Sequence, residues 1–186
     1  MKILLSVLTG AALFLYPFAV YFGITHLHVS HLALALLSLL LLRVLALPKK
    51  PADNNRRFYL ATLLITITLC LLAAWRADAL YLKFYPVVVN LSFLCVFGLS
   101  LRYPPSVIER IARIKYPDIP PAGVQHARNF TVIWCVFFIL NASVAFYTAV
   151  YADTATWALY NGLIAYALMG CLFAAEWLYR KLVLKV

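Results

Sequence analysis

The chain has 186 residues, of which 66% are hydrophobic, and its mean hydropathy is +0.92. So much apolar sequence in long runs excludes a soluble domain and a peripheral membrane protein. The net charge of +10 comes from cations that are confined to a few intervals, so it indicates membrane topology rather than nucleic-acid binding. We therefore expect an all-α, polytopic membrane protein with a single domain.

Six apolar segments approach the roughly 20 residues that a helix needs to cross a hydrocarbon core. They predict transmembrane helices at about 3–24, 29–47, 58–75, 82–101, 130–151 and 157–178. None of them alternates strictly between apolar and polar residues, which excludes membrane β-strands. The first segment is longer than the apolar region of a signal peptide and lacks a small-residue cleavage pattern, so we interpret it as a helix.

A cluster of three histidines, His26, His28 and His31, lies between the first two predicted spans. Imidazole suits zinc, copper and nickel, so the cluster is a weak candidate for a metal site. We favour an interfacial polar loop, because no acidic residue or cysteine lies nearby to complete a metal site. The four cysteines all lie in apolar runs and show neither metal-ligand nor disulfide spacing. No motif for a cofactor is found.

The polar interval 102–129 is the longest in the chain, and we expect it to be a loop that carries one short helix. Ser106 and Glu109 have the spacing of a capping box, in which each side chain accepts from the other residue's backbone N–H. They predict a helix over 107–115, ended by the prolines at 117, 120 and 121. Its apolar residues fall on one face and its charged residues around the other side. The apolar residues are Val107, Ile108, Ile111 and Ile114, and the charged ones are Glu109, Arg110, Arg113 and Lys115.

This amphipathic helix has three interpretations. It could hold anionic lipid headgroups with its apolar face in the membrane interface. It could instead dock an acidic protein, such as an acyl carrier protein or a pathway enzyme. The third interpretation is a packed connector that covers the ends of the spans.

The positive-inside rule assigns the sides of the membrane. With a cytoplasmic N-terminus, fourteen Lys and Arg fall inside and two, Arg76 and Lys83, fall outside. Both termini and the 102–129 loop are then cytoplasmic. The inside set is Lys2, Arg43, Lys49, Lys50, Arg56, Arg57, Arg102, Arg110, Arg113, Lys115, Arg128, Arg180, Lys181 and Lys185. The four tryptophans lie near predicted helix ends, as in an aromatic belt.

Three asparagines, Asn90, Asn141 and Asn161, fall within predicted spans. We expect them to hydrogen-bond between helices, although they could line a transport path. The last two spans should pack as a hairpin through small residues spaced by four. These are Asn141, Ala145 and Ala149 on one span and Ala158, Gly162, Gly170 and Ala174 on the other.

Few residues are suited to catalysis. No acidic residue lies near the centre of a span, which argues against proton coupling. Glu176 precedes Arg180 by four residues, which is the spacing of a helical ion pair. His126 has no recognisable nucleophile motif around it, so the sequence does not indicate an enzyme.

The region from Tyr85 onward resembles a family of small bacterial inner-membrane proteins encoded beside polyketide genes for aryl polyene or xanthomonadin-type pigments. The matching residues are Tyr85-Pro86 with Asn90, the run PPSVIER at 104–110, Trp134 with Phe137-Phe138 and Asn141, Trp157 with Tyr160-Asn161-Gly162, and Glu176-Trp177 before Arg180. A more distant similarity is to the septation protein A family, which is linked to envelope maintenance. It is carried by Pro105, Ile108, Arg110, the run from Trp134 to Leu140, and Trp157.

The resemblance implies an accessory role in envelope or pigment-lipid assembly. We therefore expect a non-enzymatic accessory protein that docks a protein partner or anionic lipid through Glu109, Arg110, Arg113 and Lys115. The alternative is a small transporter or flippase for an amphipathic, lipid-like product. A homodimer is left open.

Overall fold

The computed structural model describes residues 16–45 and 56–184 of the chain, and all of its regular structure there is helical. The elements are α2 (Tyr16–His26), α3 (Val29–Leu45), α4 (Arg56–Arg76), α5 (Leu80–Lys83), α6 (Tyr85–Arg102), α7 (Val107–Lys115), α8 (Pro121–Tyr151), α9 (Thr154–Leu159), a π-helical turn (Tyr160–Ile164), α10 (Ala165–Tyr179) and a second π-helical turn (Arg180–Leu184). The all-α prediction is confirmed for these residues.

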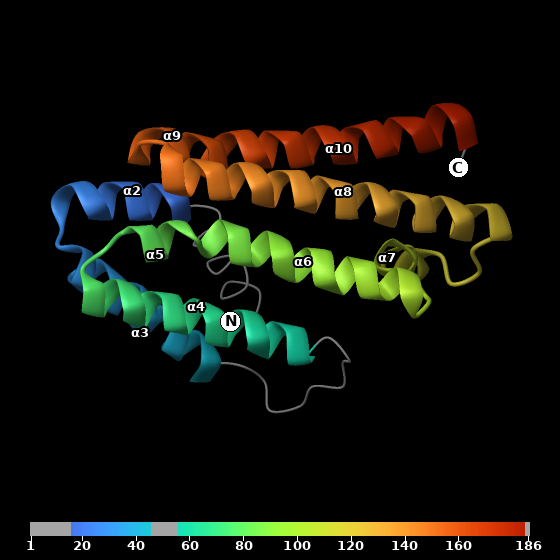
Figure 1. The fold of residues 1–186 in the computed structure, drawn as a ribbon. Coiled ribbons are helices and arrows are strands. Elements are labelled where there is room, and N and C mark those ends of the chain that lie inside the picture. The colour runs from blue at the N-terminus through green and yellow to red at the C-terminus, as the bar shows by residue number, and fades with distance from the viewer. Residues whose placement is uncertain (1–15, 46–55, 185–186) are drawn as a thin grey trace.

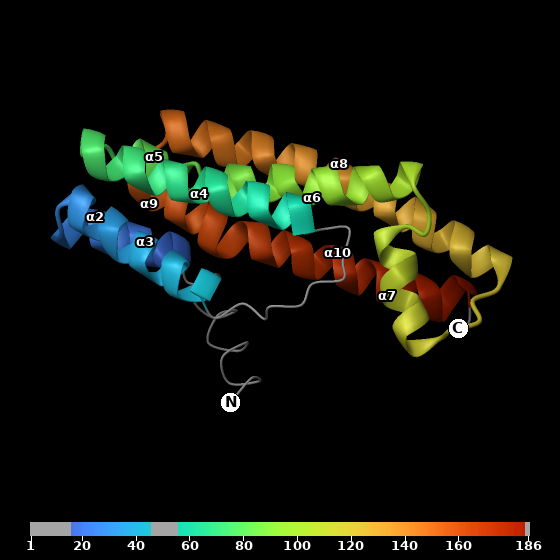
Figure 2. The ribbon, with the colours of Figure 1, turned by 90° about the horizontal axis from the view of Figure 1, so that it is seen from below.

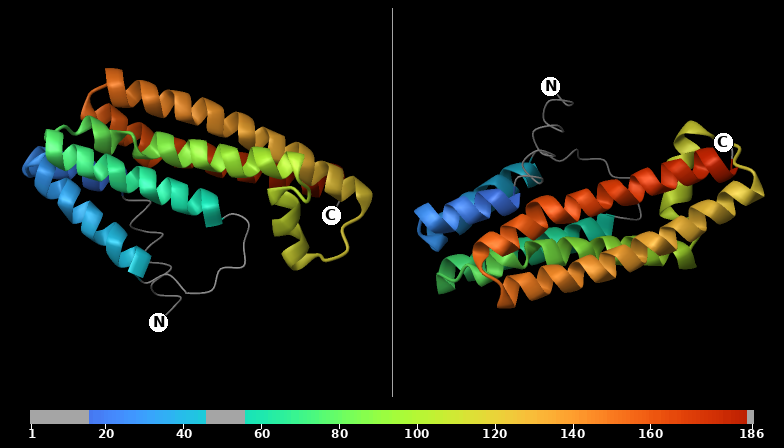
Figure 3. Two further views of the ribbon diagram at one scale, coloured as in Figure 1. Left: turned by 60° about the horizontal axis from the view of Figure 1, so that its bottom comes forward. Right: turned by 90° about the horizontal axis from the view of Figure 1, so that it is seen from above.

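The long helices run along one another in an elongated bundle. Figure 1 shows α8 and α10 along one side with α6 beneath them, and α3 and α4 form a second layer below. The views in Figures 2 and 3 agree that α7 lies at the far end of the bundle from α2 and crosses the long helices instead of running parallel to them. The bundle therefore has two different ends, one at α2, α5 and α9 and the other at α7.

Three helical stretches are long and apolar enough to cross a membrane: Leu80–Arg102, Pro121–Tyr151 and Thr154–Leu182. They correspond to the last three predicted spans. Two further apolar helical stretches are shorter within the described residues, Val29–Ser38 and Leu63–Arg76. Residues 3–15 of the first predicted span and 46–47 of the second lie outside the described residues.

The helix that contains the fifth predicted span begins earlier than its apolar sequence predicts. α8 starts at Pro121 instead of near 130, because a proline in the first turn lacks only an N–H that has no partner there. With 31 residues, the helix is about 46 Å long at 1.5 Å per residue. A hydrocarbon core is about 30 Å thick, so the polar first turns of α8 extend beyond it. The predicted loop at 102–129 is thus two helices with a short link.

Two separate cores hold the ends of the bundle. At the α2 end, Val20, Leu32, Ala73, Leu82 and Trp157 are buried together with neighbouring small residues. Three hydrogen bonds to backbone oxygens join helices there: Tyr16 Oη to Leu82 (3.1 Å), Ser30 Oγ to Ala74 (2.9 Å) and Trp157 Nε1 to Lys83 (3.1 Å). At the α7 end the core is aromatic, formed by Phe130, Trp134 and Phe138 with Phe97 and Ile108 against them.

The aromatic-belt prediction is wrong for two of the four tryptophans. Trp157 is 0% exposed and Trp134 is 3% exposed, so both belong to the cores, whereas Trp75 and Trp177 are exposed. Position along a helix gives the depth of a residue in a membrane but not the side of the helix on which it lies.

The predicted small-residue hairpin is correct only near the α9 end. Asn141, Ala145, Ala149, Ala158 and Gly162 are buried, but Gly170 and Ala174 are exposed. A ridge spaced by four residues drifts by about 40° at each step of a helix with 3.6 residues per turn, so Gly170 and Ala174 fall about 120° and 160° from Ala158. Gly162 itself faces α2, because a Cβ there would lie 2.7 Å from Phe18 Cε2.

Candidate functional site

The start of α7 is fixed by two serines from different helices. Ser106 Oγ accepts from the Glu109 N–H at 3.4 Å, as the capping-box spacing predicts, and Ser100 Oγ on α6 accepts from the Val107 N–H at 3.0 Å. The second half of the predicted box is wrong. Oε1 of Glu109 instead accepts from Nε and Nη2 of Arg113, at 2.9 and 2.8 Å. A guanidinium one turn away offers two donors at once, which competes well with a single backbone N–H.

Two of the four apolar residues of α7, Ile111 and Ile114, point away from the bundle. Ile108 packs against the aromatic core and Glu109 is buried, while Ile111 is 57% and Ile114 is 84% exposed. A helix that served only as a packed connector would bury these two isoleucines. The side that packs against α8 instead carries the Glu109–Arg113 ion pair, which leaves the most apolar surface of α7 uncovered in the described structure.

Cations flank this exposed apolar surface. At 3.6 residues per turn, Arg110 falls on one side of the Ile111–Ile114 pair and Lys115 on the other. Arg110 Nε donates to the Pro105 carbonyl at 2.9 Å, and Lys115 Nζ lies 5.1 Å from the centroid of the Tyr116 ring. The sequence prediction placed all four charged residues opposite the apolar residues, which holds for Glu109 and Arg113 only.

The depth of α7 along the bundle is set by its contact with α8. Ile108 packs beside Phe130 and Trp134, and Phe130 is the residue at which the apolar run of α8 begins. The helix therefore crosses the bundle at the boundary between the polar and apolar parts of α8. An amphipathic helix in a membrane interface has this placement and this orientation.

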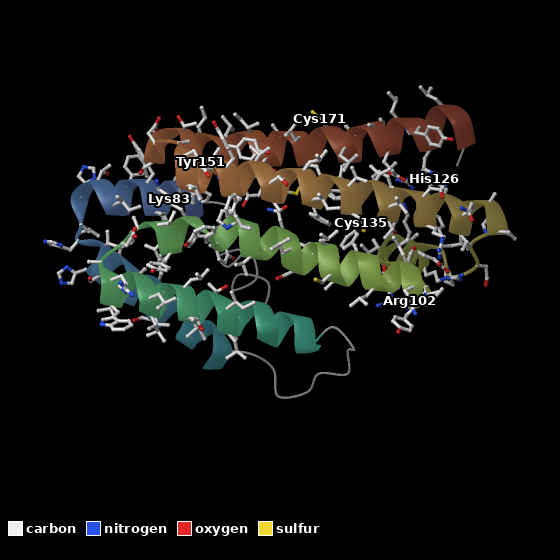
Figure 4. All side chains as sticks on the ribbon, viewed as in Figure 1. Lys83, Arg102, His126, Cys135, Tyr151 and Cys171 are labelled. Carbon is white, nitrogen blue, oxygen red and sulfur yellow. The ribbon has the colours of Figure 1, made fainter. Side chains whose placement is uncertain are left out.

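The same end of the bundle carries most of the described charge. The basic residues there are Arg102, Arg110, Arg113, Lys115, Arg128, Arg180 and Lys181, and the acidic ones are Glu109, Asp118 and Glu176. The α2 end has Arg76 and Lys83 against Asp78 and Asp153. In Figure 4, Lys83 is labelled at the α2 end and Arg102 at the α7 end. Described side chains at the α7 end thus keep a positive excess.

His126 pairs with a residue that the sequence did not connect to it. Its Nε2 lies 3.2 Å from Glu176 Oε1 on α10, and its ring stacks on Tyr179, at a centroid distance of 5.4 Å, and on Phe130 at 6.4 Å. Nε of Arg180 lies 2.7 Å from the same Glu176 oxygen, so the predicted Glu176–Arg180 ion pair is present. The cluster joins the ends of α8 and α10. A separation of 50 residues left no local signal for the histidine contact.

Two of the three asparagines hydrogen-bond to each other, and the third bonds to other neighbours. Asn141 Nδ2 donates to Asn90 Oδ1 at 2.9 Å, and Tyr160 Oη donates to Asn141 Oδ1 at 2.9 Å. Asn161 Nδ2 reaches Thr148 Oγ1 at 3.3 Å and the Trp157 carbonyl at 2.9 Å. All three asparagines are buried. Side chains bonded in this way connect α6, α8 and the π-helical turn, which is the structural role expected for them.

The histidines at the α2 end do not converge on one point. His26 Nδ1 lies 2.8 Å from Thr25 Oγ1 and 3.0 Å from the Phe22 carbonyl, and the rings of His28 and His31 meet edge to face at 6.0 Å. No group of three or more side chains that could hold a metal ion occurs in residues 16–45 or 56–184.

Comparisons with protein-family models, with curated proteins and with solved structures find no match for this chain.

Proposed function

We propose that the protein is a six-span inner-membrane protein with both termini in the cytoplasm, and that it serves as a non-enzymatic accessory in envelope or pigment-lipid assembly. In this proposal α7 is the docking surface, and it binds the anionic headgroups of the cytoplasmic leaflet. The assembly role rests on the resemblance of the region from Tyr85 onward to the pigment-associated family. The topology rests on the excess of cations on the predicted inner side.

One observation carries the docking role: the exposed Ile111–Ile114 pair between Arg110 and Lys115. Two isoleucines that leave water for a membrane interface stabilise the bound helix by the transfer of apolar surface. Each cation near an anionic surface adds about 1 kcal/mol. Because α7 lies across the bundle beside Phe130, both contributions are available at the depth where headgroups meet hydrocarbon.

The transporter alternative has less support. A transport path needs polar groups that can exchange their partners with a substrate, whereas Asn90, Asn141 and Asn161 are buried and bonded to protein atoms. Their hydrogen bonds favour a fixed helix register. The accessory role therefore remains the function that we propose.

A photo-crosslinking amino acid at position 114 tests the docking role in native membranes. We expect adducts with anionic phospholipid, identified by mass spectrometry, and much weaker lipid adducts from a control probe at Asp118, an exposed polar residue in the link after α7. A second variant, Arg110→Gln with Lys115→Gln, should lower the anionic share of the lipid adducts. Capture of a small acidic protein at position 114 would overturn lipid docking in favour of a carrier, and equal lipid adducts from positions 114 and 118 would also overturn it.

A further inference from the structure

An apolar groove lies between α6 and α8 at the depth of the asparagines. It has a volume of about 350 Å³ and is lined by Val87, Leu91 and Leu94 of α6 and by Ile139, Ala142, Ser143 and Phe146 of α8. Leu91, Ile139 and Phe146 are exposed, so the groove opens on the outer surface of the bundle. Its walls are suited to a hydrocarbon chain.

The face of α6 that lines the groove runs on toward the α7 end of the bundle. Gly98 and Arg102 follow Leu91 and Leu94 at helical spacing, and they therefore lie on the same stripe of α6. A Cβ built on Gly98 meets no atom within 4 Å, so this stripe is open between the groove and the exposed Arg102. An apolar wall thus leads from the groove to a cation.

On α8 a matching stripe leads to a second arginine. Ile139, Cys135, Val132 and Arg128 are spaced by three or four residues and share one face. Figure 4 shows Cys135 between α8 and α6, with Arg102 farther along at the end of α6. Nη1 of Arg128 donates to the Leu101 carbonyl at 3.1 Å, which brings its guanidinium beside the last turn of α6 and next to Arg102.

We propose that this groove binds one anionic phospholipid, with an acyl chain between Leu91, Leu94 and Ile139 and the phosphate at Arg102 and Arg128. The rise from Ile139 to Arg128 is about 16 Å over eleven residues, which suits the length of an acyl chain. Guanidinium groups bind phosphate by two parallel hydrogen bonds. Charge complementarity then selects phosphatidylglycerol, because phosphatidylcholine offers the same phosphate but adds a quaternary ammonium that two nearby arginines repel. This site is separate from the α7 surface and does not depend on the proposed docking role.

Native mass spectrometry of the full chain in detergent tests the site, with phosphatidylglycerol or phosphatidylcholine added at defined concentration. We expect one bound phosphatidylglycerol, and a preference over phosphatidylcholine of about tenfold, the effect of one good charge-assisted contact. The Gly98→Phe variant should lose this lipid, because the new ring fills the open stripe. A matched control is Gly170→Phe on α10, where a Cβ also meets no atom within 4 Å, and this variant should bind as the wild type does.

Two further variants separate the headgroup from the α7 surface. Arg102→Gln should weaken phosphatidylglycerol binding about tenfold and phosphatidylcholine binding by less, so that the preference between the two lipids shrinks. The pair Ile111→Ser with Ile114→Ser should leave the bound phosphatidylglycerol in place, even though it removes the proposed interfacial contact of α7. Equal retention of the two lipids by the wild type would overturn the proposal. So would unchanged binding in a folded Gly98→Phe variant, or loss of the lipid in the α7 pair.

Discussion

Polar groups join helices at both ends of the bundle, and the α7 end in addition carries cations beside exposed apolar side chains. At the α2 end, Tyr16, Ser30 and Trp157 direct their donors to backbone carbonyls on other helices, so each polar group closes a contact between helices. At the α7 end, Arg110 and Lys115 lie on the outer surface on either side of two exposed isoleucines. Polar side chains that hydrogen-bond between helices stabilise the fold. Cations that stay at the surface beside exposed apolar residues instead indicate a binding surface.

The largest expected effect is the loss of stability when Trp157, which is buried at the α2 end, is replaced. Trp157→Ala removes the largest fully buried side chain and its bond to Lys83, and it should lower the free energy of unfolding by about 3–5 kcal/mol. Denaturant titration in detergent measures this. The control Trp177→Ala removes an exposed ring that Lys181 Nζ approaches to 4.3 Å, and it should cost about 0.5–1 kcal/mol. Equal costs for the two tryptophans would contradict the contrast between the ends.

A smaller effect is expected for the asparagine network. Asn141→Ala leaves Asn90 Oδ1 and the Tyr160 hydroxyl without the partner that each has now, and it should cost about 1 kcal/mol within a membrane domain. The matched control is Ser143→Ala on the same helix, because the Ser143 hydroxyl bonds only within α8 and is exposed. Loss of product export with unchanged stability in Asn141→Ala would instead support the transporter alternative.

The smallest expected effect is a pH dependence of stability that Asp153, at the α2 end, causes. The backbone N–H and the hydroxyl of Thr156 hold the pKa of the Asp153 carboxyl below its ordinary value. A lowered folded-state pKa gives stability that is present above the unfolded pKa and is lost as the pH falls through the folded one. The melting temperature of the wild type should therefore exceed that of Asp153→Ala near neutral pH, and the difference should shrink in strong acid. A difference that is constant down to pH 2 would contradict the role of the Asp153 carboxylate as the N-cap of α9, in which it accepts from the Thr156 N–H.

Local signals in the sequence predicted local structure well. Ser106 and the prolines that follow α7 gave its bounds at 107 and 115, because a cap acts within one helical turn. Apolar length likewise predicted the three long helical stretches that match the last three predicted spans, although α8 begins before its apolar run. The sides on which residues lie were predicted less well. Trp134 is near a predicted helix end but faces inward, and Gly170 and Ala174 are exposed because a ridge spaced by four residues drifts around the helix.

Contacts between segments that are distant in the sequence could be identified only in the structure. The sequence predicted that the asparagines bond between helices, but the pairing of Asn90 with Asn141 and the pairing of His126 with Glu176 depend on how α6, α8 and α10 are aligned. Alignment results from packing over the whole length of these helices, which a short motif does not encode. For the same reason, the sequence alone could not show whether Ile111 and Ile114 point outward or are buried in a packed connector.

The most direct test of the central claim is the environment of α7 in a membrane. A variant with its cysteines replaced and Ile114→Cys introduced would carry an environment-sensitive fluorophore, and Asp118→Cys in the same background would serve as the control. In vesicles that contain phosphatidylglycerol, we predict a blue-shifted emission at position 114 that is protected from aqueous acrylamide, with the label at position 118 accessible. Equal acrylamide quenching at the two positions would contradict an interfacial α7 and, with it, the proposed docking surface.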